Sequence, residues 1–375
     1  MKNFREQFPI VKKYTYLNHA AISAPSIKVN NAVKKINDNF CNCAIDCYYQ
    51  WMEQIEHVRK LYAGLINAHA EEIAFVGNTS EGLSSIAQSL TWKENDVVLL
   101  PVSEFPANIY PWLNLEKKGV KVKYIQQRDN GRFDIEDVEK ALTPKVKLLA
   151  VSSVNFLSGF YCNLQAFGEF CRKKGILFCV DAIQSIGVIP MDVKKFGIHF
   201  LAAGAYKWML GCMGTGAIYV SSEIREAVCP AIVGWKSVVN DDDFFEINFN
   251  IKPNALGFEP GAMNISGIYA LGAAIELINE AGVENIKKKV FSINDLFIKG
   301  LSKRGIKIIT PLGKDERSGI LSFQAPGNRE KLYEFLSSRN IMVSLRKNLI
   351  RLSPHFYNDK SDVSSFFKCI DDFYA

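Results

Sequence analysis

The 375-residue chain has no uncharged apolar run as long as the roughly 18 residues of a membrane-spanning helix. Its first residues, MKNFREQFPIVKKY, contain no apolar core of a secretory signal. No internal repeat, low-complexity tract or Pro/Gly-rich linker is present. We therefore expect a globular cytoplasmic protein, with reduced cysteines and no membrane partner.

Concentrated positive charge is also missing. The chain has 45 basic and 39 acidic residues, a formal net charge of +6. Its basic clusters are scattered and not interleaved with aromatic residues: Lys117-Lys118, Arg172–Lys174 and Lys287–Lys289. Because nucleic-acid binding needs basic residues gathered on one face, we expect no nucleic-acid partner.

Paired cysteine motifs of the zinc-binding type are absent. The chain has nine cysteines, and three of them lie in CNCAIDC, residues 41–47. The C-x-C-x₃-C spacing lacks the paired C-x₂-C halves of common zinc sites. We expect no metal site, and cysteines within apolar runs act as small hydrophobic residues.

Between residues 71 and 221, short β-rich runs alternate with helix-like stretches. Near-continuous apolar strands that alternate with helices are typical of a mostly parallel sheet covered on both faces. In such sheets, ligands bind at the carboxyl ends of the strands. The predicted strands are EIAFVG, DVVLLP, VKVKYI, KLLAVSSV, ILFCVDA, HFLAAGA and TGAIYVS.

The pattern changes after Pro260. Long amphipathic helical segments follow, then the short strand-like runs KIITPL, GILSFQA, MVSLR and LIRLSP, and a last helix at DVSSFFKCIDDFY. We expect a large α/β domain over residues 16–264 and a smaller α+β domain formed by residues 1–15 and 265–375.

One cation lies in the otherwise small and apolar stretch AAGAYKWMLGCMGTG: Lys207. A buried lysine is costly unless it is paired, neutral or covalently used. The strand LFCVDAIQSIG ends in Asp181, which on its own is better interpreted as a helix cap. Together, however, an aspartate and a lysine at one sheet edge suit a pyridine-ring aldehyde cofactor: the carboxylate holds a proton on the ring nitrogen and the lysine forms the imine.

Such a cofactor carries a phosphate, which helix N-termini bind well. FVGNTSEGL is a strand followed by Asn78, Thr79 and Ser80 at the start of a helix, where capping uses the same amide groups. Phe105 follows another strand and could lie against a flat ring, although a core position is the simpler interpretation. Asn155, at the end of a further strand, could bond the phenolic oxygen of the ring.

The sequence resembles the class V aminotransferase family of pyridoxal-phosphate-dependent enzymes, which includes cysteine desulfurases, selenocysteine lyases and isopenicillin N epimerases. The resemblance implies their fold, the aspartate aminotransferase-like α/β fold with a seven-stranded sheet. It rests on eight motifs in the family's order: YLNHAAISAP, NTSEG, EFPANIYPW, VDAIQSIG, AYKWMLGCMGTG, GWKSV, FEPGAMN and RLSPHFYN.

The resemblance also implies a role for each matching residue. Lys207 would be the Schiff-base lysine and Asp181 the partner of the pyridine nitrogen. Arg351 would bind the substrate α-carboxylate, with Asn18 and His19 nearby. The remaining cofactor contacts would come from Thr79, Ser80, Phe105, Asn155, Gln184, Tyr206 and, toward the partner subunit's cofactor in a homodimer with active sites at the interface, Asn264.

The sequence departs from the desulfurase pattern at several positions. Desulfurases of the family have a loop cysteine shortly before the carboxylate-binding arginine, whereas this region reads NIMVSLRKNLIRLSP; Cys369 lies beyond it, in a predicted helix. They have a histidine where Phe105 stands, and phenylalanine cannot relay protons. Tyr206 and Ala262 replace residues that bind phosphate in relatives, and only Tyr206 could still offer a hydroxyl.

These observations favour an enzyme that acts at the α-carbon of a small amino acid, as a transaminase or a β-eliminating lyase. A desulfurase or selenocysteine lyase with an unusual sulfur acceptor is one alternative, and a scaffold that has lost its chemistry is another. A nicotinamide-dependent dehydrogenase would have a similar sheet, but no G-x-G-x-x-G follows an early strand.

Overall fold

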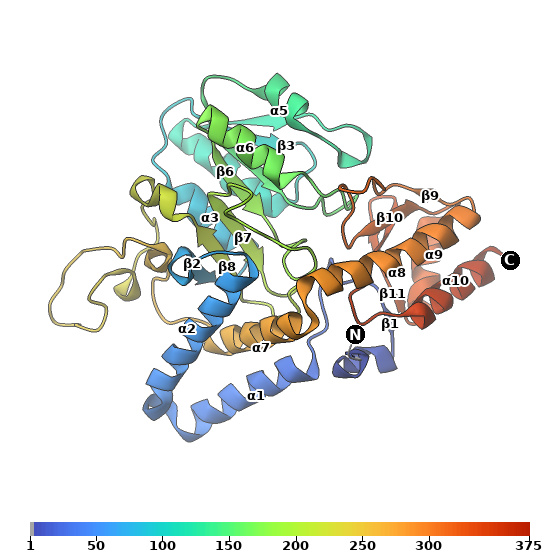
Figure 1. Cartoon of the computed structure of the whole chain (residues 1–375), viewed down its shortest axis with the longest axis horizontal. Coiled ribbons are helices and arrows are strands. Elements are labelled where there is room, and N and C mark those ends of the chain that lie inside the picture. Colours follow the sequence, from blue (N-terminus) through green and yellow to red (C-terminus); the bar gives the residue numbers. More distant parts are fainter. Residues whose placement is uncertain (1–3) are drawn as a thin grey trace.

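A seven-stranded sheet forms the centre of the computed structural model, which describes residues 4–375, Asp129 by its backbone alone. The strand order is β2-β8-β7-β6-β5-β3-β4 (Figure 1), with β8 antiparallel to both neighbours and the other pairings parallel. This confirms the predicted α/β fold. The strands are β2 (Ile73–Val76), β3 (Val97–Pro101), β4 (Lys121–Ile125), β5 (Val146–Ser152), β6 (Leu177–Asp181), β7 (Phe200–Gly204) and β8 (Gly216–Val220).

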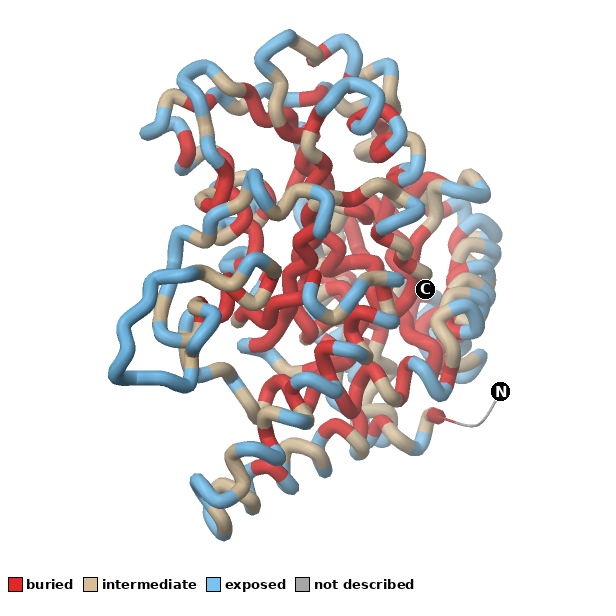
Figure 2. Tube along the Cα trace, turned by 60° about the vertical axis from the view of Figure 1, so that its left-hand side comes forward, coloured by how far each residue is buried: buried red, intermediate tan, exposed pale blue. Residues whose placement is uncertain are grey.

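Helices cover both faces of this sheet because successive side chains of each strand point to opposite sides. In β6, Phe178 and Val180 pack into one core cluster and Cys179 into another. Figure 2 shows the buried residues concentrated along the central strands. The covering helices are α3 (Thr79–Ser89) and α4 (Tyr110–Leu113) on one face, and α2 (Tyr48–Leu65), α5 (Ile135–Ala141), α6 (Leu164–Lys174) and α7 (Ile265–Ala281) on the other.

The carboxyl ends of six strands share one edge of the sheet, because β4 is also parallel to β3. β3, β5, β6 and β7 are parallel, and β2 runs the same way because β8 is antiparallel to both β2 and β7. The register pairs Ser152 with Asp181 and Asp181 with Ala202. Residues that follow these strands therefore gather at one place, as the sequence predicted.

The C-terminal part has a core of its own. Its four-stranded antiparallel sheet, in the order β12-β13-β10-β9, packs with three helices around Phe297, Phe323 and Phe366. A two-stranded parallel sheet joins β1 (Thr15–Tyr16) to β11 (Ile341–Met342). The other elements are β9 (Lys307–Ile308), β10 (Leu321–Gln324), β12 (Ser344–Arg346), β13 (Leu349–Leu352), α8 (Val283–Lys303), α9 (Arg329–Ser338) and α10 (Lys360–Tyr374).

Helix α8 connects the two cores (Figure 1). Its Ile286 and Val290 belong to the core of the large sheet, and its Phe297 and Leu301 to the C-terminal core. Helix α7 packs against α1 (Ile27–Asn42) and α2, beneath the large sheet. The division of the chain at residue 264 stays a prediction.

Helices α1 and α2 form a hairpin that the sequence patterns did not predict. Residues 41–51, which sequence patterns do not place, are the end of α1, a short 3₁₀ turn (Ala44–Cys47) and the start of α2. This turn brings together Cys43 and Cys47, which form a disulfide. The expectation that all cysteines are reduced is therefore wrong for this pair, and the other seven cysteines are free.

Candidate active site

The sheet edge brings Asp181 and Lys207 together. Asp181 is the last residue of β6, and Lys207 follows the neighbouring strand β7. Both side chains are buried, with 3% and 8% of their surfaces exposed. The predicted pairing of a carboxylate and an amine at one edge is present in the structure.

Lys207 lines a cavity of about 470 Å³. Its Nζ lies 5.6 Å from the ring centre of Phe105 and 5.7 Å from that of Tyr206. Burial, together with the nearby guanidinium groups of Arg351 and Arg346, lowers the pKa of Lys207 to about 8, and Asp181 opposes the shift. The amine is therefore partly neutral, and hence nucleophilic, near physiological pH.

Asp181 and Gln184 lie on the segment that leaves β6. Burial raises the pKa of Asp181 to about 6, although one carboxylate oxygen accepts a hydrogen bond of 3.0 Å from the Ile183 amide. Gln184 lines the cavity while its amide donates to the Ala20 carbonyl and its oxygen accepts from Trp208 Nε1. These bonds fix the orientation of the Gln184 side chain.

The start of α3 forms another part of the cavity. Gly77 and Asn78 line it, and the Asn78 side chain accepts a hydrogen bond from the Glu81 amide as the N-cap. Thr79 is buried, and its hydroxyl accepts a hydrogen bond of 2.9 Å from the Gly204 amide. Ser80 is exposed and lines a neighbouring hollow that it shares with Phe105. The N-terminus of α3 thus lies at the cavity, and the binding of a phosphate there stays a prediction.

Protein groups of its own loop and of the segment after β3 hold both ends of the Asn155 amide. Its amide nitrogen donates to the carbonyl and hydroxyl of Ser103, and its oxygen accepts from the amides of Leu157 and Ser158. The next residue, Phe156, lines the cavity and packs edge-to-face on Phe105. Contact between Asn155 and a ligand stays a prediction.

Arg351 lies on β13 and faces the cavity from the C-terminal sheet. It is 2% exposed, and its Nη1 donates to the Phe156 carbonyl at 2.5 Å. Its buried Nε has no hydrogen-bond partner among the described residues. Burial and the charge of Arg346 lower the pKa of Arg351 to about 9. A buried guanidinium with an unused donor favours binding of an anion.

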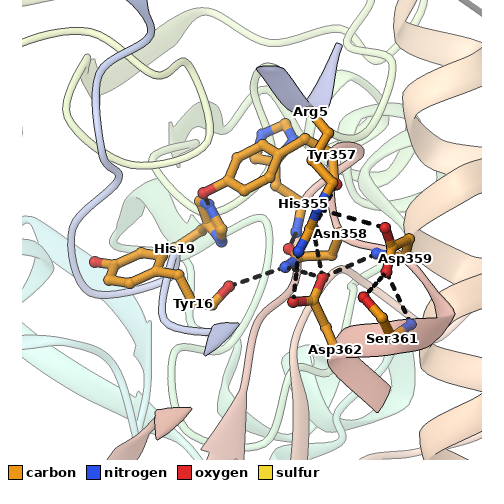
Figure 3. A network of polar contacts seen from close by, with 9 residues as sticks. All are labelled: Arg5, Tyr16, His19, His355, Tyr357, Asn358, Asp359, Ser361 and Asp362. Carbon is orange, nitrogen blue, oxygen red and sulfur yellow. Dashed lines mark hydrogen bonds and ion pairs between the residues drawn. The ribbon is translucent and has the colours of Figure 1, made fainter. Parts of the chain in front are cut away.

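Asn18 and His19 lie behind the cavity and not among its lining residues. The buried His19 ring contacts the Ser353 carbonyl and the Tyr357 hydroxyl, at 2.8 and 2.7 Å. Figure 3 shows His19 beside a polar network that extends through Asn358 to Asp362 and Arg5. Burial holds the pKa of His19 well below its usual range. The proposed substrate contacts of both residues stay predictions.

Asn264 caps α7 at an adjacent hollow. Its amide donates to the Gly214 carbonyl at 2.8 Å and its oxygen accepts from the Gly267 amide. Gly77 and Gly214 border both this hollow and the cavity of Lys207, and Ala262 lies in the same hollow. Asn264 therefore lies close to the site without lining it.

Two residues of the site were not predicted from sequence. Glu104 is buried, accepts hydrogen bonds from the amide and hydroxyl of Ser152, and has a pKa raised to about 7 by burial and by Asp181. Its place beside Phe105, after a strand, was the available signal. Arg346 lines the cavity at the end of a strand-like run whose sequence indicates only a structural role.

The hairpin before Arg351 contains no cysteine, and Cys369 is buried in α10. None of the described residues that line the cavity is a cysteine; the partly buried Cys212 is next in sequence to the lining residue Met213. Among the described residues, no cysteine therefore occupies the position of the sulfur-accepting loop cysteine of desulfurases.

A lysine–aspartate pair at the strand ends of this mostly parallel sheet defines an enzyme of the pyridoxal-phosphate-dependent transferase fold. The family model described as Aminotransferase class-V matches residues 15–366. The chain therefore belongs to the class V aminotransferase family of pyridoxal-phosphate-dependent enzymes, as the motifs predicted.

Individual relatives also match this chain over almost its whole length. The chain is 28% identical to a probable cysteine desulfurase of Methanothermobacter thermautotrophicus, covering 96% of this chain and 95% of the relative. It is 29% identical to an uncharacterized aminotransferase, YcbU, of Bacillus subtilis, with the same coverage. A cysteine desulfurase structure from Thermococcus onnurineus superposes with a TM-score of 0.91 at 25% identity, covering 99% of this chain and 97% of that one. Within the described part of the chain, none of the helices has the length and apolar composition of a membrane span.

Proposed function

We propose that this enzyme binds pyridoxal 5'-phosphate covalently through Lys207 and acts at the α-carbon of a small amino acid, by transamination or β-elimination. The observation that carries the proposal is the Lys207 amine, buried at a cavity with Asp181 behind it and Arg351 across from it. When bound, the cofactor supplies an electron sink that stabilises negative charge at the substrate α-carbon.

The residues of the cavity fit this cofactor. Lys207 forms no ion pair with a carboxylate of the described residues, so its amine is available to an aldehyde. A volume of about 470 Å³ is within the range of pockets that bind small organic ligands. Asp181 would hold a proton on the ring nitrogen, Phe105 would lie against the ring, and the amides at the start of α3 would hold the phosphate with Thr79 and Ser80.

The chain's own groups have defined roles in the reaction. Arg351 binds the α-carboxylate, for which its free Nε and its buried charge are suited. Lys207 would act as the acid/base that removes the α-proton and delivers a proton to a different atom, because its lowered pKa suits proton transfer near neutral pH. Gln184, Asn155 and Tyr206 remain our proposed additional contacts of the ring and phosphate.

Transamination or β-elimination fits the site better than desulfuration through a loop persulfide. The hairpin of Arg346 and Arg351 offers no thiol, and Phe105 cannot pass a proton. The names of the relatives favour a second candidate, a cysteine desulfurase that passes sulfur to an acceptor outside this hairpin.

We also infer a homodimer with active sites at the subunit interface. Residues 238–251 project from the body (yellow to gold in Figure 1), and four of their apolar side chains are 65–97% exposed: Phe244, Phe245, Ile247 and Phe249. Such an exposed apolar group is typical of a protein interface. The hollow of Asn264, next to the active-site cavity, is a suitable place for the partner to approach.

Borohydride treatment tests the proposal. We expect a yellow protein whose colour bleaches while a cofactor-sized mass stays on the peptide of Lys207; a colourless protein that cannot be reconstituted contradicts it. Incubation with a panel of amino acids then divides the reactions: pyridoxamine formation indicates transamination and pyruvate indicates β-elimination. Sulfur transferred directly from cysteine to a protein thiol and retained as a persulfide, with alanine as the second product, would instead establish the desulfurase.

A further inference from the structure

The hairpin β12–β13 presents two arginines on one face. Ser344 pairs with Arg351 and Arg346 with Leu349, so Arg346 and Arg351 are diagonal neighbours with side chains on the same side of the ladder. In this arrangement their Cβ atoms are roughly 7–8 Å apart. Both arginines line the cavity of Lys207.

The cavity has more positive charge than the proposed reaction uses. Lys207, Arg346 and Arg351 line it, and none of its described lining residues carries a carboxylate. Arg346 forms no ion pair with a described carboxylate; its guanidinium contacts only the carbonyl of Leu345, at 3.4 Å. Its charge lowers the pKa of both Lys207 and Arg351, which places it within electrostatic reach of the two groups.

The proposed reaction already uses the other two cations, since Lys207 holds the cofactor and Arg351 the α-carboxylate. It leaves Arg346 without a role, and Arg346 is exposed to solvent whereas Arg351 is buried. A cation at this position, one step along the hairpin from the carboxylate-binding group, suits the far end of the same substrate.

We propose that Arg346 binds a second anionic group on the substrate side chain, so that the enzyme prefers short amino acids with an acidic side chain, such as a carboxylate or a sulfinate. This assignment rests on the proposed function, because it takes Arg351 as the site of the α-carboxylate. Arg346 is then a specificity residue and takes no part in proton transfer.

Two unreactive four-carbon acids test this assignment, succinate with two carboxylates and butyrate with one. Calorimetric titration of the holoenzyme at fixed ionic strength should give a dissociation constant for succinate about tenfold lower than for butyrate. Arg346→Gln should weaken succinate about tenfold and change butyrate less than about twofold. Arg346→Lys, which keeps a charge but loses the bidentate fork, should recover part of the preference.

Lys347→Gln is the matched control. It removes the same charge one residue further on, at a position that does not line the cavity, and should leave the preference intact. The proposal is overturned by a wild type without preference, by an equal loss in both variants, or by an Arg346→Gln protein that loses cofactor affinity while keeping its preference for succinate. Mass analysis of Lys207 in the same samples reports separately on the proposed function.

Discussion

The pKa of the Lys207 amine is set by opposing effects of its surroundings. Burial and two arginines lower its pKa, and the Asp181 carboxylate raises it. The neutral amine is the nucleophile that captures an aldehyde. We therefore predict that the apo-protein takes up pyridoxal phosphate faster as the pH rises, with a midpoint near 8. Stopped-flow absorbance measured on both sides of this midpoint gives the rate.

The substitution Asp181→Asn tests the direction in which the carboxylate shifts the pKa of Lys207. Because the carboxylate favours the protonated amine, its loss should lower the pKa of Lys207 and move the midpoint to lower pH. A midpoint near 10, the ordinary range of a lysine, or a shift in the opposite direction would show that burial does not control this amine.

Glu104 makes stability depend on pH. Its pKa is raised from 4.5 to about 7, so the folded apo-protein binds a proton that the unfolded chain releases. This contribution to stability is fully present below pH 4.5 and is lost as the pH rises to about 7. At a pH about one unit above this range, Glu104→Gln should therefore stabilise the apo-protein by roughly 1–3 kcal/mol. Near pH 4.5 the substitution should have little effect.

Urea unfolding of the apo-protein at the two pH values measures this difference. Glu116→Gln, at an exposed position, serves as the control and should change the free energy of unfolding at neither pH. If Glu104→Gln destabilised the protein equally at both pH values, the hydrogen bonds to Ser152, not the cost of a buried charge, would dominate.

At the residue scale, the sequence predicted the residues whose chemistry depends on strand order. Strand order predicted that Asp181 and Lys207 lie at one sheet edge, whereas Arg351, which lines the same cavity as Lys207, was predicted from the family resemblance alone. Sequence could not predict the direction of a side chain within a loop or a buried network, which is why Asn155 and His19 point to protein partners. Arg346 was not predicted as a site residue, because its position beside Arg351 depends on the register of the hairpin.

At the scale of the elements, Gly168 lets α6 lie close to the turn that precedes β7. A Cβ at this position would be 1.7 Å from the carbonyl oxygen of Phe196, which is backbone and cannot move freely. Gly168→Ala should therefore destabilise the protein by roughly 1–3 kcal/mol, although alanine favours the helix.

Gly64→Ala is the matched substitution. Gly64 lies in α2, where an added Cβ would have no atom within 4 Å, so helix propensity alone should stabilise the protein by about 1 kcal/mol or less. Denaturant midpoints of the two variants compare them directly. A stabilised Gly168→Ala protein would mean that α6 can move away from Phe196 without cost.

Sequence patterns were sufficient to find all seven strands of the central sheet. Six of them are largely buried and read as short apolar runs, whereas the edge strand β4 is mostly exposed and reads as the β-rich run VKVKYI. These patterns were not sufficient for α1 and α2. The turn between these helices is a cysteine-containing 3₁₀ segment, and α1 has few buried residues, Val29 and Ile36. Helix α1 packs mainly against α7, which lies far along the chain, and local sequence patterns do not reveal such a long-range contact.

At the scale of the whole molecule, the exposed apolar side chains of segment 238–251 bear on whether the protein is a monomer or a dimer. Phe245 and Ile247 are 97% and 89% exposed, an arrangement that is unfavourable unless another surface covers it. We predict a dimer in solution. Phe245→Ser combined with Ile247→Ser should shift the protein toward monomers, raising the dimer dissociation constant about tenfold or more. Sedimentation equilibrium measures this constant.

Leu312→Ser separates an interface from general surface hydrophobicity. Leu312 is 45% exposed in the C-terminal part of the chain, away from segment 238–251, and its substitution should leave the dimer unchanged. Activity offers a second readout: if active sites lie at the interface, the specific activity of the double variant should fall with dilution in parallel with dimer content. A double variant that stays dimeric, or monomers with full activity, would rule out this segment as the contact that completes the site.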